Sequence, residues 1–286
     1  DNSRENLKHE VGDRIFEEVR DAATKEWQKL LSTVHIEGGR KKDRRIFYTA
    51  LYRCFNMPTV FNDVNGQYIG FDKQTHTAEG FNYYTDMSLW DTFRTTHPLY
   101  TLLIPDRHRD MLVSLVTMAK QGGNLPRWPS GAGYTNSMFG APTEIAVAEA
   151  YLKGITDFDI EAAYQVMRRA ALNPAPDGAP YAGRRDISSY MEYGYCPSDL
   201  MSKAVAKTLE YSTTDAAISR LATALGHEDD AALFAERSRS YRNLWNAETE
   251  YFQPRDAAGE FSTPLKPLLL TYLDPQGHFT DDYVEG

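Results

Sequence analysis

Apolar residues recur every three or four positions along most of the chain, which is the spacing of amphipathic helices. Similar repeats predict helices over residues 12–34, 105–121, 143–153, 159–172, 199–225 and 229–245, and a shorter run containing Phe47, Leu51, Cys54 and Phe55 ends at Pro58. Gly122, Gly154 and Gly226 follow three of these repeats. Glycine is the usual residue just past the end of a helix, so these positions support the predicted boundaries.

Alternating β patterns are nearly absent, and only short stretches around Asn65-Gly66 and over 251–261 predict small hairpins between helices. Helices paired through long, aromatic-rich loops indicate an all-α fold, an (α/α)6-barrel-like helical toroid whose loops line a pocket at one end. The pattern accounts for about four helix pairs, whereas a closed barrel of this type has six. We therefore expect residues 1–286 to be a single domain that forms the first part of such a barrel.

Composition and charge exclude several classes of protein. Apolar residues make up 42% of the 286 positions and aromatic residues 12%, which permits a large core. Forty acidic against 31 basic residues give a net charge of −9, the wrong sign for a nucleic-acid or anionic-membrane binder. No apolar run approaches the roughly 18 residues of a membrane span. No signal peptide is recognisable at the start, so we expect either that it was removed or that the sequence is an internal piece.

The segment 80–99 combines the most aromatic and charged chemistry. Trp90, Asp91 and Arg94 lie within about one helical turn of each other. An aromatic ring can cover the C–H face of a sugar while charged groups bind its vicinal hydroxyls. The simpler alternative, from these residues alone, is a helix start with a buried tryptophan and an Asp91–Arg94 ion pair.

Other candidate residues also leave two interpretations open. Trp128 is either a wall of a sugar subsite or a loop-packing residue, and Glu144 is either a pocket residue or a first-turn acid favoured by the helix dipole.

The histidines show no metal-ligand spacing, which argues against a zinc site. Residues 63–66 resemble the start of a calcium loop but lack its final acid, so they predict a hairpin turn. Cys54 and Cys196 are predicted to be ordinary buried thiols.

Seven segments, in order, resemble glycoside hydrolase family 92. They are Phe-Tyr-Thr-Ala-Leu-Tyr-Arg (47–53), Tyr-Thr-Asp-Met-Ser-Leu-Trp-Asp-Thr-Phe-Arg (84–94) with His-Pro-Leu (97–99), Gly-Asn-Leu-Pro-Arg-Trp (123–128), Ala-Tyr-Leu-Lys-Gly (150–154), Lys-Thr-Leu-Glu-Tyr (207–211), Arg-Ser (237–238) with Tyr-Arg-Asn-Leu (241–244), and Tyr-Val-Glu-Gly (283–286). Each motif is modest, but together they cover nearly the whole chain in the order of the family.

The resemblance implies an upstream β-sandwich domain, a six-pair α/α barrel, and an exo-α-mannosidase that hydrolyses terminal α-mannosides of glycans with inversion. It also implies a general-acid glutamate, a general-base aspartate about 6.5–9.5 Å away, and a bound calcium ion (Ca2+), whose many oxygen ligands suit a sugar's hydroxyls. The corresponding family motifs lie beyond residues 283–286. We therefore predict no catalytic acid, no catalytic base and no metal ligand within this sequence.

Trp90, Asp91 and Arg94 match a loop that resembles part of the family's mannose subsite, and this match favours a substrate-binding role for them. Trp128 matches another pocket-lining position, and Glu285 begins a motif at the pocket rim; with Glu144 these complete the predicted substrate-binding set. The family is commonly exported, which implies a secreted, periplasmic or cell-surface protein.

Two departures and two alternatives remain. Residues 141–144 replace a histidine-containing stretch, which leaves the linkage specificity open, and residues 214–216 replace the usual Asp-Asp-Trp, a packing change. The alternative functions are another α/α-barrel glycosidase of the trehalase or glucoamylase type and a non-catalytic glycan-binding fragment.

Overall fold

The computed structural model describes residues 1–175 and 183–262. Its helices are α1 (Asn2–Glu10), α2 (Phe16–Leu31), α3 (Lys41–Cys54), α4 (Leu89–Thr92), α5 (Thr96–Leu103), α6 (Pro105–Gly122), α7 (Pro142–Leu152), α8 (Ile160–Leu172), α9 (Ile187–Tyr193), α10 (Ala204–Leu225), α11 (Glu228–Arg237) and the 3-10 helix η1 (Ser240–Leu244). The described strands form only two-stranded sheets: β1 (Thr59–Val60) with β4 (Tyr84–Thr85), β2 (Gln67–Ile69) with β3 (Thr75–Thr77), β5 (Pro129–Ser130) with β6 (Gly133–Tyr134), and β7 (Trp245–Asn246) with β8 (Tyr251–Phe252). The all-α prediction with minor hairpins is confirmed.

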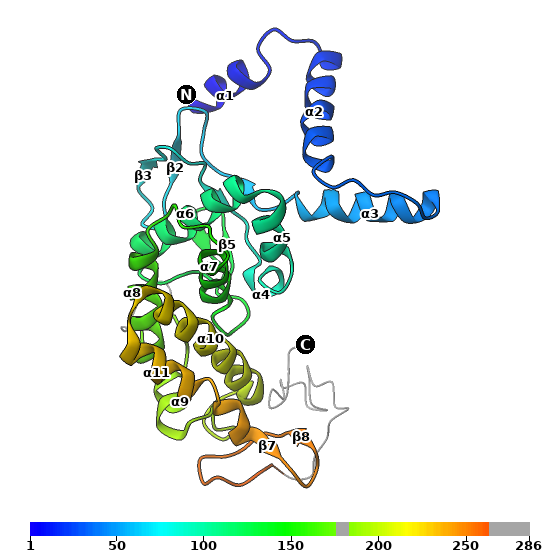
Figure 1. Cartoon of the computed structure of the whole chain (residues 1–286). Coiled ribbons are helices and arrows are strands. Elements are labelled where there is room, and N and C mark those ends of the chain that lie inside the picture. Colours follow the sequence, from blue (N-terminus) through cyan, green and yellow to red (C-terminus); the bar gives the residue numbers. More distant parts are fainter. Residues whose placement is uncertain (176–182, 263–286) are drawn as a thin grey trace, which may run out of the picture.

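The body of the molecule consists of α4 to α11, with α10 packed against α7, α8 and α11 (Figure 1). Leu112 and Leu115 of α6 and Ile218 of α10 are fully buried in the main core. Three alanines of α7 and the alanine at its N-cap are also buried, and their small side chains let neighbouring helices approach closely: Ala146, Ala148, Ala150 and Ala141.

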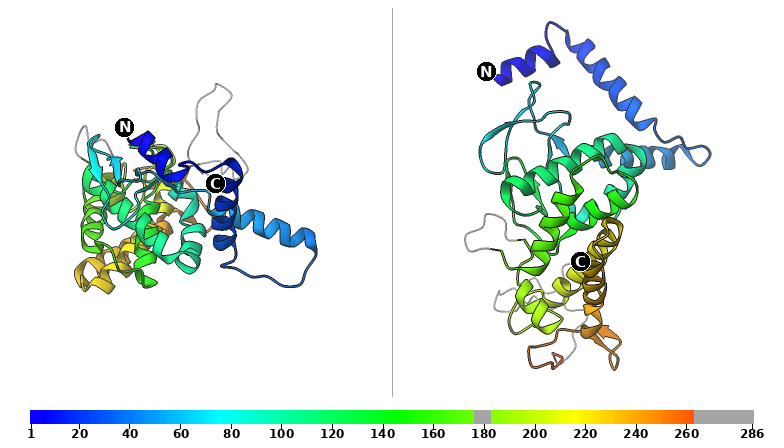
Figure 2. Two further views of the ribbon diagram at one scale, coloured as in Figure 1. Left: turned by 90° about the horizontal axis from the view of Figure 1, so that it is seen from above. Right: turned by 60° about the vertical axis from the view of Figure 1, so that its left-hand side comes forward.

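The helices α1, α2 and α3 extend away from this body (Figures 1 and 2). Helices α1 and α2 bury no residue, and α3 buries only Leu51. Asn2 and Asn6 tie α1 to the carboxylate of Asp63 through hydrogen bonds of 2.7 and 2.6 Å. The amphipathic stripes of α2 and α3 therefore face solvent over most of their length.

Several predicted boundaries were wrong. The repeat over 12–34 forms a helix only from Phe16, and α1 precedes it. The helix expected from residue 199 begins at Ala204, because Lys203 has a left-handed backbone with φ 57°, which a continuing helix does not allow. The region 229–245 divides into α11 and η1, and the short helices α5 and α9 were not predicted.

The hairpin near Asn65-Gly66 is displaced from its predicted turn. Residues 63–66 do form a tight turn, with the Gly66 N–H donating to the Asp63 carbonyl at 2.8 Å, but this turn only leads into β2. The turn that joins β2 to β3 is closed by Gly70 and Gln74. The second hairpin pairs Trp245 with Phe252 and is extended by a bridge between Arg255 and Phe261.

Candidate functional site

Trp90 and Asp91 lie on α4, and Arg94 follows it by two residues. The chain entering α4 runs beside the segment that leads to Trp128: the Met87 N–H donates to the Pro129 carbonyl and the Leu89 N–H to the Arg127 carbonyl, both at 3.1 Å. Met87 and Leu89 are buried. These contacts fix the start of α4 against the loop that carries Trp128, so two of the predicted sugar-contacting segments are adjacent.

Arg94 pairs with Glu210 of α10 and not with Asp91. Its guanidinium lies 3.4 Å from the Glu210 carboxylate, with side-chain exposures of 50% and 14% respectively. It also lies over the ring of Trp90, 5.1 Å from the centroid. The Asp91–Arg94 ion pair considered from the sequence is thus absent; Asp91 is exposed and accepts a hydrogen bond from the Ser88 hydroxyl.

Glu210 is the functional candidate that the sequence reasoning missed. Burial raises the pKa of the Glu210 carboxyl, while Arg94 and the Trp90 indole act in the opposite direction. The indole Nε1 of Trp90 is buried and has no hydrogen bond of good geometry, although it lies near this carboxylate. A Cβ on Gly140, whose φ is +74°, would lie 2.9 Å from Glu210 Oε2. Only glycine at position 140 therefore leaves Glu210 its present position.

The loop after Trp128 is organised by Arg127. This buried guanidinium donates to the carbonyls of Ser137 and Gly140, at 3.3 Å each, and of Gly183, at 3.2 Å. The loop brings Phe139 edge-on to Trp90, with ring centroids 6.4 Å apart. The ammonium of Lys203 lies 5.3 Å from the Phe139 ring centroid. Trp128 itself is half-buried at the start of this loop.

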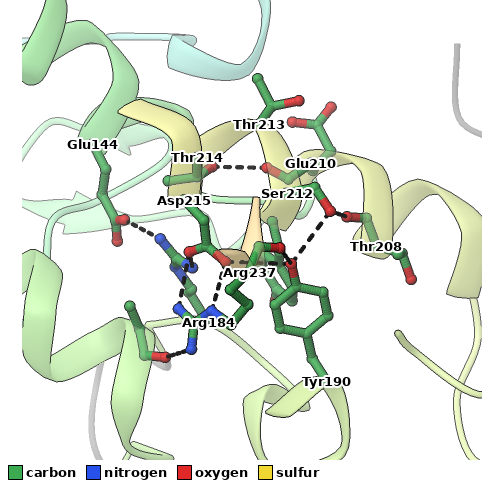
Figure 3. A network of polar contacts seen from close by, with 12 residues as sticks. Glu144, Arg184, Tyr190, Thr208, Glu210, Ser212, Thr213, Thr214, Asp215 and Arg237 are labelled. Atoms are coloured by element: carbon green, nitrogen blue, oxygen red, sulfur yellow. Dashed lines mark hydrogen bonds and ion pairs between the residues drawn. The ribbon is translucent and has the colours of Figure 1, made fainter. Parts of the chain in front are cut away.

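Glu144 lies apart from this group, in a buried ion network that Figure 3 shows. Arg184 donates to Glu144 and to Asp215, at 2.6 Å each, and Asp215 also accepts two bonds from Arg237. The Tyr190 hydroxyl donates to Asp215 at 3.3 Å. Two carboxylates thus face two guanidiniums, and the network joins α7, α9, α10 and α11. Because Glu144 is buried and paired with Arg184, we leave it out of the sugar-binding group proposed below.

Two histidines meet in the core, although their sequence spacing gave no sign of it. His97 Nδ1 of α5 and His108 Nε2 of α6 are 3.0 Å apart, and Thr101 bonds the second ring. Burial lowers the pKa of His97 to about 3 and that of His108 to about 4. Both rings are therefore neutral at ordinary pH, so one ring can donate a hydrogen bond that the other accepts. This bond joins α5 to α6.

Within residues 1–175 and 183–262, no three His, Cys, Asp or Glu side chains gather in a way that could hold a metal ion. The calcium ion that the resemblance implies therefore has no such cluster of side chains among the described residues, and its ligands stay a prediction for positions outside them. Glu285 falls outside the described residues. Of the two cysteines, Cys196 is buried as predicted, whereas Cys54 is partly exposed.

The sequence profile of the "Glycosyl hydrolase family 92 catalytic domain" matches residues 2–286. The chain belongs to glycoside hydrolase family 92. A family 92 α-mannosidase of Bacteroides thetaiotaomicron is 33% identical, with a TM-score of 0.87 over 99% of this chain and 36% of its own. A family 92 inverting mannosidase of Bacteroides thetaiotaomicron VPI-5482 is 29% identical, with a TM-score of 0.90 over 100% of this chain and 37% of its own.

An uncharacterized secreted glycosidase of Arthroderma benhamiae is 25% identical over 91% of this chain and 31% of its own length. The family 92 chain described here thus spans about a third of these relatives. Its agreement with the solved structures confirms the helical-barrel fold class and the assignment to a glycoside hydrolase family. In the described part of the chain, no helix is long and apolar enough to cross a membrane.

Proposed function

We propose that the protein is an exo-acting, inverting α-mannosidase that releases terminal α-linked mannose from glycans. The observation that carries this proposal is the family 92 match over residues 2–286, together with two solved relatives that are both mannosidases. One of them is an inverting mannosidase, and the other has been solved with mannoimidazole bound.

The group around α4 supplies the sugar-holding part of this proposal. The ring of Trp90 offers an apolar face for the pyranose, and the exposed carboxylate of Asp91 is free to accept bonds from its hydroxyls. Arg94 is half exposed and engages Glu210 with one nitrogen at 3.4 Å, so other donors remain for the substrate. Trp128, on the adjoining loop, is proposed as a second wall, and Glu285 as a rim residue.

We assign the general acid, the general base and the calcium ligands to positions outside the described residues. An inverting enzyme separates its two carboxyl groups by about 6.5–9.5 Å so that a water molecule fits between them. The described residues offer no such calcium site, and no step proposed for them involves the ion. Their contribution is to bind and orient the terminal sugar.

The alternatives are weaker. The match to the family 92 catalytic domain argues against a trehalase- or glucoamylase-like enzyme. A role in glycan binding alone would leave the Trp90 group intact but would give no hydrolysis. We also propose export from the cytoplasm, which the secreted relative supports.

The experiment compares four substrates with the protein expressed from its complete gene. We expect hydrolysis of an aryl α-mannoside and none of an aryl α-glucoside or of trehalose. A linear α-mannan oligosaccharide with a reduced end should lose single mannose units from its non-reducing end. Hydrolysis of the glucosides, or release of internal fragments, contradicts the proposal, and binding of mannan without hydrolysis supports the glycan-binding alternative.

A further inference from the structure

Helix α10 provides a rigid support beside the candidate sugar site. Asp215 on this helix is completely buried and bonds to both Arg184 and Arg237. Thr208, two turns before Asp215 on the same face of the helix, accepts a hydrogen bond from the Cys196 N–H at 2.9 Å. Glu210 lies between these two anchors, so its backbone is fixed from both sides. Figure 3 shows its carboxylate directed away from the ion network.

From this support, Glu210 reaches two of the predicted sugar-binding side chains, Arg94 and Trp90. Its carboxylate faces the Arg94 guanidinium at 3.4 Å and lies near the Trp90 indole N–H. The guanidinium in turn covers the Trp90 ring, and Phe139 borders that ring on another side. Arg94 and Phe139 are thus two neighbours of the Trp90 ring, and Glu210 pairs with the charged one.

The packing around Glu210 indicates that this arrangement is specific. Gly140 leaves just enough room for the carboxylate, since an added Cβ would approach both Cβ and Oε2 of Glu210 to 2.9 Å. The Arg94 side of this pair is half exposed and the two groups are 3.4 Å apart, so solvent screens the pair and it contributes little to the stability of the fold. The tight space around the Glu210 carboxylate is therefore not explained by the stability of this pair. It is better explained if the carboxylate serves to place Arg94 and Trp90.

We propose that Glu210 is a positioning residue, which holds the Arg94 guanidinium and the Trp90 ring in the orientation that accepts the terminal sugar. This inference rests on the proposed function, because it assigns the substrate contacts to Trp90 and Arg94. Glu210 acts through these two residues and does not itself take part in bond cleavage. Its ionised form is the active one, since only the carboxylate attracts the guanidinium.

The test uses Glu210→Gln in the full-length protein, with mannoimidazole as the probe. We expect about fivefold weaker binding by calorimetry, the factor that corresponds to about 1 kcal/mol, with an unchanged melting temperature. The ratio of wild-type to variant affinity should fall toward one as the pH is lowered through the raised pKa of Glu210, because the wild-type carboxyl is then neutral like the amide. Glu161→Gln is the matched control, since Glu161 lies on a helix and accepts a side-chain hydrogen bond, from Gln165 at 2.7 Å, but its neighbour at 3.3 Å is His227 and not a residue of the Trp90 group.

A second measurement is independent of sugar binding. Loss of the Glu210 charge should increase acrylamide quenching of Trp90 fluorescence, and this increase should disappear in a Trp90→Phe background. Unchanged quenching together with a pH-independent affinity ratio overturns the inference while leaving the mannosidase proposal intact. If wild-type protein does not bind mannoimidazole, the proposed function fails, and the quenching result alone then decides whether Glu210 positions Trp90.

Discussion

A single substitution can distinguish a sugar-binding role of Asp91 from a role in the stability of the fold. It is exposed, and the Ser88 hydroxyl bonds to its carboxylate, so it contributes little to the fold. Asp91→Asn keeps the shape but weakens a charge-assisted hydrogen bond worth about 1.5–3 kcal/mol. We expect kcat/KM on an aryl α-mannoside to fall roughly ten- to hundredfold, with the melting temperature unchanged. Asp229→Asn, an exposed acid on α11, is the control, and equal kinetics for both variants would remove Asp91 from the site.

Arg184, unlike the exposed Asp91, is completely buried and lies between two carboxylates. Arg184→Met leaves Glu144 and Asp215 without one of their charged partners, and breaking a buried pair costs about 3–5 kcal/mol. Urea unfolding should show this loss. Arg168→Met removes a half-exposed guanidinium from Asp230 and should cost less than about 1 kcal/mol. Similar losses in the two variants would show that the network does not stabilise the fold as described.

At the scale of elements, helices α5 and α6 are joined by the neutral pair His97–His108. Burial lowers both pKa values, to about 3 and about 4, from an ordinary 6.5. Below pH 6.5 the unfolded chain therefore binds more protons than the folded one. The stabilisation is complete above pH 6.5 and is lost as the pH falls toward 4 and then 3.

Melting temperatures measured from pH 7 to pH 4 test this dependence. We expect a decline in the wild type that is shallower in His108→Gln, because one of the two titrating groups is gone. The variant will be less stable at pH 7, so the comparison concerns the slope and not the absolute value. Parallel slopes in the two proteins would contradict the assignment of neutral buried rings.

The sequence predicted the long amphipathic helices well, such as α6 and α8, because the apolar residues of their repeats are the ones that become buried. Helices α5 and α9 escaped prediction because they have only eight and seven residues, too few for an apolar repeat to recur. The site was predictable only in part. Trp90 and Arg94 are neighbours in sequence, but Glu210 is 116 residues from Arg94 and is brought there by tertiary packing alone. The pairing of His97 with His108 was missed for the same reason.

At the scale of the whole molecule, α1 to α3 present apolar side chains to solvent. Ile15, Phe16 and Ile46 are 60%, 74% and 58% exposed. Large exposed apolar surfaces drive association, so we expect the 286-residue chain made alone to self-associate and to bind a hydrophobic dye.

Sedimentation velocity on Phe16→Ser/Ile46→Ser tests the source of this association. The double variant should be more monomeric than the parent chain, whereas Leu102→Ser, which changes an exposed residue of the body, should have little effect. A monodisperse, dye-free parent chain would show that the N-terminal helices are covered in solution.

We propose that this family 92 chain belongs to an enzyme that cleaves terminal α-mannosides with inversion. Proton NMR of the reaction of the full-length protein with an aryl α-mannoside tests it most directly, because the anomeric signals identify the first product before mutarotation. We expect β-mannose to appear first and α-mannose only later. The appearance of α-mannose first, or the absence of any mannose release, would contradict it.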